Sequence, residues 1–446
     1  MNTFPPTTPA ESISEPSPLV IPRAQHPISR RLIDEDALKI LYRLHRHGYR
    51  AFLVGGCVRD LLLGRTPKDF DIGTNATPSR IKRLFSNCFL VGRRFRLAHI
   101  HCANEKIIEV ATFRRQPRPE EIPEEPAQQF RFVENVFGTP AEDAFRRDFT
   151  INALFYDIAT FAVLDYTGGI ADLHSRTLRV IGQPEIRFRE DPVRMLRAIE
   201  LAKRLDFTMD DELIRGLRTC AAFIADASPA RIRDRIFELA QRGVLGTILR
   251  EAAAFGMLAP LLAGYQGQEA TFALLERLDE RNAAGVPTEE SMLLAALFLE
   301  RFLAGSPPQN GTVNAHKTAN GLLQPHCQYF HIAHGLRHQA QEILVTAGRL
   351  QRGPDARGAR RLLLHPFFAQ ALELLSLWSL DHADLETLIR SWRSKALSGE
   401  KSVQADAPQQ SPKRSGRHRR RRRSRRKAPG EHSSHALPPS SRSPEP

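Results

Sequence analysis

The segment that decides the fold spans residues 52–71 and reads FLVGGCVRDLLLGRTPKDFD. Its apolar start predicts a strand, which Gly55 and Gly56 separate from a helix over 58–63. Glycine lets the backbone approach a triphosphate closely, and the N-terminus of a helix favours anions. The spacing is neither that of a P-loop nor that of a GxGxxG fingerprint, which counts against an ordinary ATPase and against a dinucleotide-binding protein.

The segment ends in Asp69, Phe70 and Asp71, which we assign to a second strand over 69–72. Alternate side chains of a strand point to the same side, so Asp69 and Asp71 would project together while Phe70 points into the core. Two adjacent carboxylates repel each other, and divalent metal ions are their usual partners where phosphate chemistry is nearby. Each pattern alone is most often an ordinary turn or solvated surface, but in this order they support each other as one site.

Four further motifs follow in order: LVGRRFRLAH over 90–99, IIEVATFR over 107–114, RRDFTINA over 146–153 and REDPVRMLRA over 189–198. With the opening segment they resemble the polymerase-β-like nucleotidyltransferases, in the branch that holds bacterial poly(A) polymerases and tRNA CCA-adding enzymes. The resemblance implies an α+β fold, with a small mixed-sheet nucleotidyltransferase head, an all-helical body and disordered tails. The expected parts are a disordered leader (1–27), the head (28–165), a neck with the nucleobase-recognition helix (166–225), a helical RNA-binding body (226–395) and a disordered basic tail (396–446).

The resemblance also assigns the catalytic carboxylates. Asp69 and Asp71 are the natural ligands of Mg²⁺, with Mn²⁺ as the alternative, since both ions suit oxygen ligands. Asp148 in the RRD motif is the expected third catalytic acid. Glu109 is the alternative, because its strand could run beside that of Asp71. The other reading of Asp148 is an ion pair that orients a neighbouring arginine.

Nucleotide binding is expected at residues from three of the motifs. The assigned residues are Gly55, Gly56, Arg59, Lys68, Arg147, Glu190, Asp191, Arg194 and Arg197. Asp191 and Arg194 stand at i and i+3, so on one helix face they could read a base edge together, and the alternative is an ordinary ion pair on a solvated helix. The alternative for Arg59 is an ion pair with Asp60 or Asp143.

The net charge of +14 is concentrated near the C-terminus. Residues 413–427 contain eleven Lys or Arg and no acid, which leaves +3 for the rest of the chain. Such runs are usually disordered arms for nucleic acid, so we assign RNA binding to Arg419, Arg420, Arg421, Arg422 and Arg423. Residues 114–133 are rich in Arg, Pro and Glu, which predicts a mobile loop beside the site.

Other site classes find little support in the sequence. The five cysteines are scattered, which favours neither a zinc site nor a disulfide framework. His99 and His101 are more often structural at this spacing than metal ligands. We see no signal peptide and no apolar run of membrane-spanning length, so a cytoplasmic enzyme without a membrane partner is expected.

Residues 91–99 distinguish the two kinds of enzyme in this branch, because they resemble the poly(A) polymerase version of the motif. The expected function is template-independent addition of AMP from ATP to RNA 3′ ends, making tails that promote RNA decay. ATP, RNA 3′ ends and proteins of RNA decay are the expected partners. The alternatives are a CCA-adding or A-adding tRNA nucleotidyltransferase and a catalytically silent RNA-binding protein.

Overall fold

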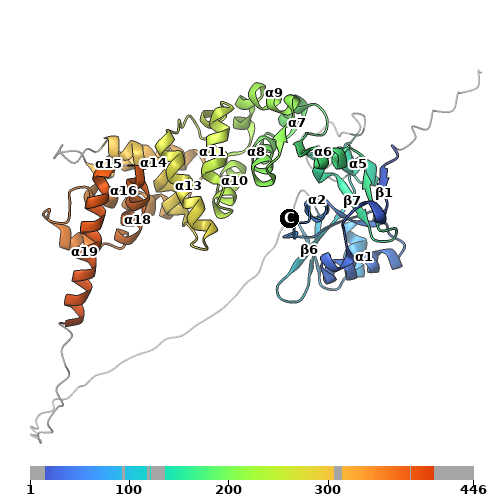
Figure 1. Cartoon of the computed structure of the whole chain (residues 1–446), viewed down its shortest axis with the longest axis horizontal. Coiled ribbons are helices and arrows are strands. Elements are labelled where there is room, and N and C mark those ends of the chain that lie inside the picture. The colour runs from blue at the N-terminus through green and yellow to red at the C-terminus, as the bar shows by residue number, and fades with distance from the viewer. Residues whose placement is uncertain are drawn as a thin grey trace, which may run out of the picture. The chain divides into compact units, whose positions relative to one another are not determined.

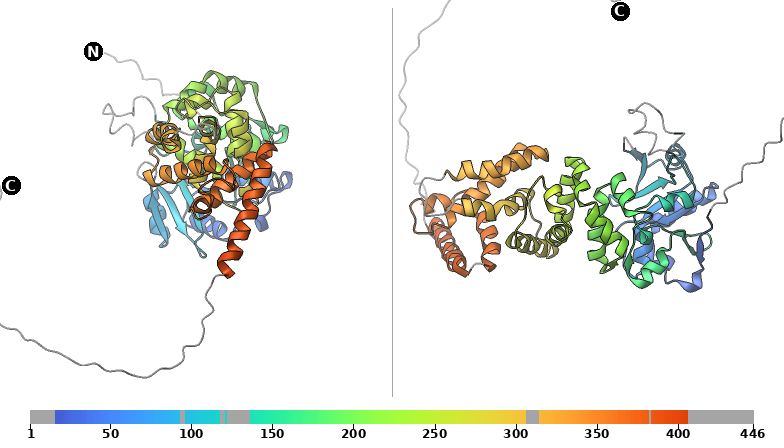
Figure 2. Two further views of the ribbon diagram at one scale, coloured as in Figure 1. Left: turned by 90° about the vertical axis from the view of Figure 1, so that its left-hand side faces the viewer. Right: turned by 90° about the horizontal axis from the view of Figure 1, so that it is seen from above.

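The computed structural model describes residues 16–92, 96–117, 121, 136–305, 314–381 and 383–405. The start of the leader, most of the predicted loop over 114–133 and the arginines over 419–423 lie outside the described residues. A sheet with its helices forms the N-terminal part, and almost only helices follow (Figures 1 and 2). No helix among the described residues is long and apolar enough to span a membrane.

Eight strands form one mixed sheet in the order β1-β8-β7-β2-β3-β6-β5-β4. Its strands are β1 (Leu19–Ile21), β2 (Ala51–Val54), β3 (Asp71–Thr74), β4 (Cys88–Val91), β5 (Leu97–His101), β6 (Ile107–Thr112), β7 (Leu154–Asp157) and β8 (Ala162–Asp165). All neighbours in this sheet are antiparallel except β3 and β6, which run parallel. The predicted mixed-sheet head is confirmed.

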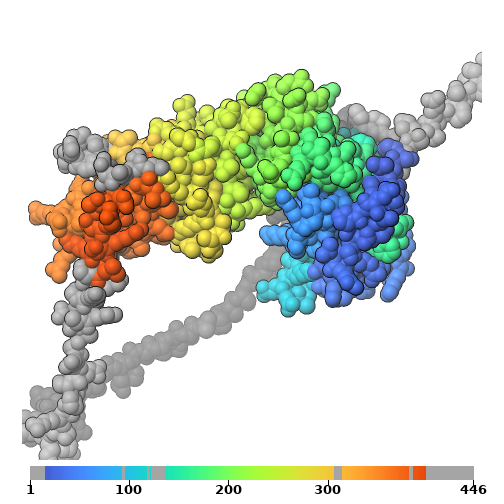
Figure 3. All heavy atoms as spheres, viewed as in Figure 1, coloured from blue at the N-terminus to red at the C-terminus, as the bar shows by residue number. Residues whose placement is uncertain are grey.

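The prediction that the whole leader is disordered was wrong for its last residues. β1 pairs with β8, with Leu19 opposite Asp165 and Ile21 opposite Val163. Figure 3 shows the result on one face of the head, where early residues in blue adjoin green residues from far along the sequence. A strand of three residues is specified by this distant pairing rather than by a local pattern.

Helices cover the sheet through apolar side chains. α1 (Glu35–Arg46) begins at the Asp34 cap, whose carboxylate accepts hydrogen bonds from two backbone N–H groups. It contacts β2 and buries an apolar face that includes Leu41 and Leu44. α3 (Pro78–Leu84) contacts β4 and β5.

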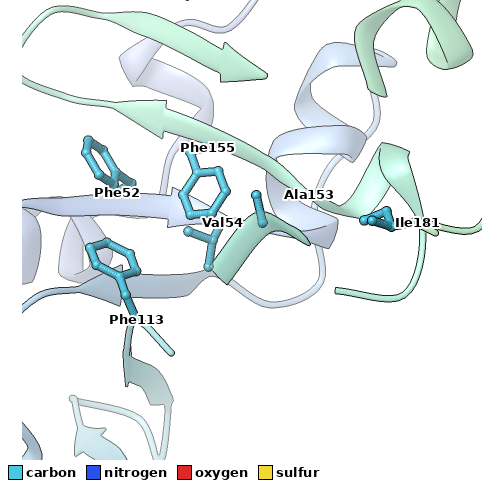
Figure 4. Close-up of a cluster of buried hydrophobic side chains, with 7 residues drawn as sticks. Phe52, Val54, Phe113, Ala153, Phe155 and Ile181 are labelled. Atoms are coloured by element: carbon cyan, nitrogen blue, oxygen red, sulfur yellow. The ribbon is translucent and has the colours of Figure 1, made fainter. Parts of the chain in front are cut away.

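A cluster of buried apolar side chains, which includes Phe52, Phe113 and Phe155, packs against the sheet (Figure 4). Val54 of β2 stands opposite Asp71, and Phe52 stands opposite Gly73, so these four residues share one side. The ring of Phe113 packs over Gly73, where an added Cβ would lie 2.6 Å from Cε1 of the ring. The short β3 therefore carries Asp71 at one end and a close aromatic contact near the other.

Helices make up most of the remaining structure. They are α2 (Gly56–Leu62), α5 (Pro140–Phe145), α6 (Gly169–Ser175), α7 (Pro184–Glu190), α8 (Val193–Leu205), α9 (Asp211–Thr219), α10 (Pro229–Gln241), α11 (Leu245–Ala254), α12 (Leu258–Leu261), α13 (Glu269–Ala283), α14 (Glu290–Gly305), α15 (Ala315–Tyr329), α16 (His334–Leu350), α17 (Ala359–Leu363), α18 (Phe368–Trp378) and α19 (Ala383–Ala405). Two short strands, β9 (Thr177–Leu178) and β10 (Thr208–Met209), pair in parallel. The helical body is confirmed, but α19 continues into the segment predicted to be disordered from residue 396.

One buried acid joins α8 to α10. Glu200 of α8 is 6% exposed and accepts hydrogen bonds from Arg235 of α10 and from Arg242, which caps that helix. Charges this deeply buried need partners, so the pairing holds the two helices in a defined register.

Candidate active site

The Gly55-Gly56 turn connects β2 to α2 in a conformation that requires glycine. Gly55 has a φ of +76°, in the left-handed region, and its N–H donates to the carbonyl of Leu154. A Cβ at Gly55 would lie 3.1 Å from an amino nitrogen of Arg147. Arg147 is therefore placed directly beside the turn.

The carboxylates meet through the only parallel pair of strands in the described sheet. β3 begins at Asp71, so the expectation of a strand over 69–72 was wrong at its start, and exposed Asp69 precedes the strand. Ile72 pairs with Val110 in β6, which places Glu109 beside Asp71. Burial, the negative charge of Glu109 and that of Asp69 raise the pKa of Asp71 to about 6, while Arg147 opposes the shift.

These carboxylates fit a divalent cation. Asp71 is half-buried between two other acids, and a metal ion would relieve this repulsion. Within the described ranges, no group of three or more His, Cys, Asp or Glu side chains is arranged to hold a metal by itself. Mg²⁺ usually binds one or two carboxylates together with substrate phosphates, so Asp69 and Asp71 could serve once a triphosphate is present.

Glu109 also reaches the next strand. It stands opposite His99 of β5, and its Oε1 lies 3.5 Å from Nε2 of that histidine. Asp71, Glu109 and His99 thus follow one another across β3, β6 and β5. The structural role expected for His99 agrees with this contact.

The arginines expected at the phosphates have different surroundings. Arg147 donates two hydrogen bonds to Asp143, at 2.9 and 3.1 Å, and lies over the ring of Phe155. Arg59 is 3% exposed and is held by Asp60 and by the side chain of Asn152. The ion pair of Arg59 with Asp60 is the alternative that we considered from the sequence.

Lys68 is exposed. It stands directly before Asp69, so its ammonium group belongs to the same segment as the first of the two aspartates.

Asp148 lies among arginines rather than among the charges that act on Asp71. Its carboxylate is 2.6 Å from Arg194 and 3.1 Å from Arg197. The charges acting on Asp71 come from Glu109, Arg147 and Asp69. The ion-pair role that we weighed for Asp148 is present, but its partners come from α8 instead of its own motif.

The expected base-reading pair does not share a helix. α7 ends at Glu190 and α8 begins at Val193, and Asp191 between them is extended. The argument from i and i+3 positions on one helix face was therefore wrong for Asp191 and Arg194. Arg194 instead donates to Glu190, at 2.8 Å, while Asp191 pairs with Arg197 and with Arg231 of α10.

Two residues that the sequence analysis missed connect the RRD motif to α7 and to Arg59 of α2. Buried Arg187 of α7 donates to the carbonyls of Arg146 and Arg147, each at 2.7 Å, and also to Glu190. Asn152 holds Arg59 through its side chain and accepts a hydrogen bond from Arg147 through its carbonyl. Asn152 stands inside the quoted RRDFTINA motif, which was the signal available for it, whereas Arg187 lies two residues before the REDPVRMLRA motif and had no such signal.

Comparisons with known proteins identify the family. A sequence model described as the Poly A polymerase head domain matches residues 51–179, and one described as the polymerase A arginine-rich C-terminus matches residues 308–427. Poly(A) polymerase I of Salmonella typhi is 39% identical over 404 residues, which cover 86% of each chain. The chain belongs to the poly(A) polymerase family. This membership confirms the resemblance found in the motifs and the prediction of a nucleotidyltransferase.

CCA-adding enzymes are more distant relatives of this chain. The CCA-adding enzyme of Lactobacillus gasseri is 32% identical over 274 residues, which cover 59% of this chain and 63% of that enzyme. The solved CCA-adding enzyme of Bacillus stearothermophilus, in complex with CTP, matches with a TM-score of 0.59 at 23% identity. That match covers 86% of this chain and 90% of the other, and it supports the fold of head and helical body.

Proposed function

We propose that this chain adds AMP from ATP to RNA 3′ ends without a template and releases pyrophosphate. The observation that carries the proposal is the position of Asp69, Asp71 and Glu109 beside the Gly55 turn and Arg147. Two acids beside the half-buried carboxylate of Asp71 suit a cation, and the turn with its arginine suits a triphosphate. The 39% identity to poly(A) polymerase I supports ATP and RNA over CTP and tRNA as substrates.

Asp69 and Asp71 would hold Mg²⁺, with Mn²⁺ as the alternative. When bound, the metal would lower the pKa of the attacking 3′ hydroxyl and neutralise charge on the triphosphate. Glu109 is the third acid that we favour, because its charge acts directly on Asp71. Asp148, the residue assigned from the family motif, would act through Arg194, which it holds.

The triphosphate would lie against the backbone of Gly55 and Gly56, with Arg147 as its main guanidinium contact. Arg147 is half-buried and already oriented by Asp143, so little freedom remains to be lost on binding. Lys68 is exposed next to Asp69 and could approach the phosphates. Arg59 is bonded to Asp60 and Asn152 and lies against Gly56, so it would support the turn rather than contact phosphate itself.

The base of ATP would be read by side chains around the α7–α8 junction. Glu190, Arg194 and Arg197 converge there, and Asp191 completes the group from the extended linker. Arg194 donates hydrogen bonds to Glu190 and to Asp148, and these bonds fix the plane of its guanidinium group. Recognition of a base by Arg194 would depend on this fixed plane. This is the arrangement we propose for choosing ATP over CTP.

The RNA would be held by the helical body and by the basic tail with Arg419 to Arg423. We place the reaction in the cytoplasm, where RNA and ATP are available, and expect proteins of RNA decay as further partners. The resulting tails would mark RNA for degradation.

Incorporation of labelled AMP by the purified chain and by Asp69→Ala tests the proposal. The wild-type chain should extend an unstructured RNA with ATP and Mg²⁺, and the variant should not, although its circular dichroism and thermal unfolding match those of the wild type. Lys39→Ala is the matched control, because Lys39 is an exposed α1 residue paired with Asp36. Clear activity in Asp69→Ala would contradict the metal site, and an inactive wild-type chain would contradict the function.

A further inference from the structure

A basic pocket lies in the helical body where α16 ends and α17 begins. It has a volume of about 280 Å³, near the lower end of ligand-binding pockets. Its charged lining consists of Arg349, Arg352, Arg357, Arg361 and His365. All four arginines are exposed, so their guanidinium groups can reach a ligand that enters from solvent.

The positive charge of this pocket is not neutralised by the surrounding protein. Across the described ranges, the guanidinium groups of Arg352, Arg357 and Arg361 have no ion pair or side-chain hydrogen bond. Two acids of this region are already engaged: Asp355 pairs with Lys395, and Glu342 lies between two histidines. Several unpaired charges of one sign around a concavity concentrate the field, which favours an anion.

The wall of the pocket is fixed by contacts between helices. Trp392 of α19 is fully buried and donates its indole N–H to the carbonyl of Leu350, which ends α16. Glu342 lies 3.5 Å from both His316 and His365, and His316 in turn contacts Arg349 at 3.3 Å. These contacts hold the two sides of the pocket without using its remaining arginines.

The turn that forms the pocket has an unusual backbone. Gly353 and Gly358 have φ values of +85° and +95°, and they bracket the segment that carries Arg357. Only glycine adopts these angles readily, so the chain reverses sharply between α16 and α17. The reversal brings Arg352 and Arg361, on either side of it, into one lining.

We propose that this pocket binds backbone phosphates of the RNA strand, away from the 3′ end that reacts. The inference rests on the proposed function, which makes RNA the substrate. A guanidinium group can donate two parallel hydrogen bonds to one phosphate, so four arginines exceed the need of a single anion and suit consecutive phosphates of a strand. The chemistry in the head needs only the RNA 3′ end, and a second contact would retain long RNA between additions.

The test compares two neighbouring arginines of α17 in the full-length chain. Arg361 lines the pocket, whereas Arg360 is also exposed and does not line it, so Arg361→Gln and Arg360→Gln remove the same charge from adjacent positions. Binding of a long unstructured RNA is measured at several salt concentrations. We expect Arg361→Gln to weaken binding severalfold and to lower the salt slope by about 0.7, the value for one lost phosphate contact on a single strand.

Arg360→Gln should retain the wild-type salt slope. Equal losses in the two variants would overturn the proposal in favour of diffuse surface charge. No loss in either variant would also overturn it. A second arm follows thermal unfolding with inorganic tripolyphosphate. Stabilisation that Arg361→Gln abolishes while RNA binding stays unchanged would also overturn the proposal, because the pocket would then take a free anion.

AMP incorporation by the wild-type chain is measured in the same preparation. Unchanged RNA binding in an active enzyme would refute the pocket alone. An inactive wild-type chain would refute the proposed function, and the binding comparison of Arg361→Gln with Arg360→Gln would still decide whether the pocket holds RNA.

Discussion

The Nε atom of Arg194 lies 2.6 Å from Oδ1 of Asp148. The same guanidinium donates to Glu190 and to the carbonyl of Arg187, each at 2.8 Å. One side chain of α8 therefore connects the RRD motif of the head to the end of α7. This connection links the proposed base-reading residues to Arg147, because Arg187 holds the backbone of Arg147 as well.

Arg194→Lys should impair nucleotide selection although it keeps the charge. An ammonium group cannot satisfy three acceptors in the planar arrangement of a guanidinium. Losing a charged hydrogen bond of about 1.5–3 kcal/mol corresponds to a roughly ten- to hundredfold fall in kcat/KM for ATP. Steady-state incorporation with ATP and CTP measures this fall. Arg189→Lys is the control, since Arg189 of α7 is exposed over the ring of Phe223, and equal selectivity in all three enzymes would contradict the role of Arg194.

Glu109→Gln and Asp148→Asn should have different kinetic effects. If Glu109 completes the acidic cluster, Glu109→Gln should lower kcat with ATP by about ten- to hundredfold and retain the preference for ATP over CTP. If Asp148 positions Arg194, Asp148→Asn should chiefly raise KM for ATP and weaken the preference for ATP over CTP. Kinetics with both nucleotides separate the two outcomes, and the reverse pattern would restore Asp148 as the third catalytic acid.

Gly73→Ala should destabilise the head and reduce activity together. The added Cβ would lie 2.6 Å from the ring of Phe113 and 2.9 Å from Val54, and such overpacking typically costs about 1–3 kcal/mol. The strain falls on β3, which positions Asp71. Gly321→Ala is a control in α15, where nothing lies within 4 Å of the added methyl group. That control should be neutral or slightly stabilising, and a Gly73→Ala protein as stable as the wild type would contradict the close contact.

His326 should make the stability of the helical body depend on pH. It lies between the rings of Phe298 and Phe330, at 5.2 and 4.6 Å, and burial lowers its pKa to about 4. Below its ordinary pKa of 6.5, the unfolded chain takes up a proton that the folded chain does not. The contribution of His326 to the free energy of unfolding should therefore fall as the pH falls from about 6.5 to about 4, by at most about 3 kcal/mol.

Urea unfolding at several pH values measures this effect. His326→Leu should remove this contribution and so change the profile between pH 6.5 and 4, whereas His338→Gln, at an exposed position of α16, should leave the profile as it is. An unchanged pH profile in His326→Leu would show that another group carries the dependence.

Much of the head could be predicted because its signals are local. Gly55 and Gly56 stand between an apolar run and a helix, and the strands over 88–91 and 107–112 follow from short apolar stretches. β1 is an apolar stretch of only three residues, and its pairing with β8 is what identifies it as a strand. The extended Asp191 could have been foreseen, since a residue before proline is biased away from the helix, and Pro192 follows it.

The candidate site was only partly predictable for a related reason. Its acids are close because β3 and β6 are parallel, which brings Asp71 and Glu109 together across a long sequence separation. No spacing in the chain reveals this register. The partners of Asp148 likewise come from α8, so its motif alone could not show whether it faces a metal or an arginine.

Extension of two labelled RNAs tests the central claim most directly. One is an unstructured oligonucleotide and the other is a tRNA that lacks its CCA end, each supplied with ATP, with CTP or with both in the presence of Mg²⁺. The account expects a long ladder on the oligonucleotide with ATP alone. Addition that requires CTP and stops once CCA is complete on the tRNA would contradict it and would make the chain a CCA-adding enzyme.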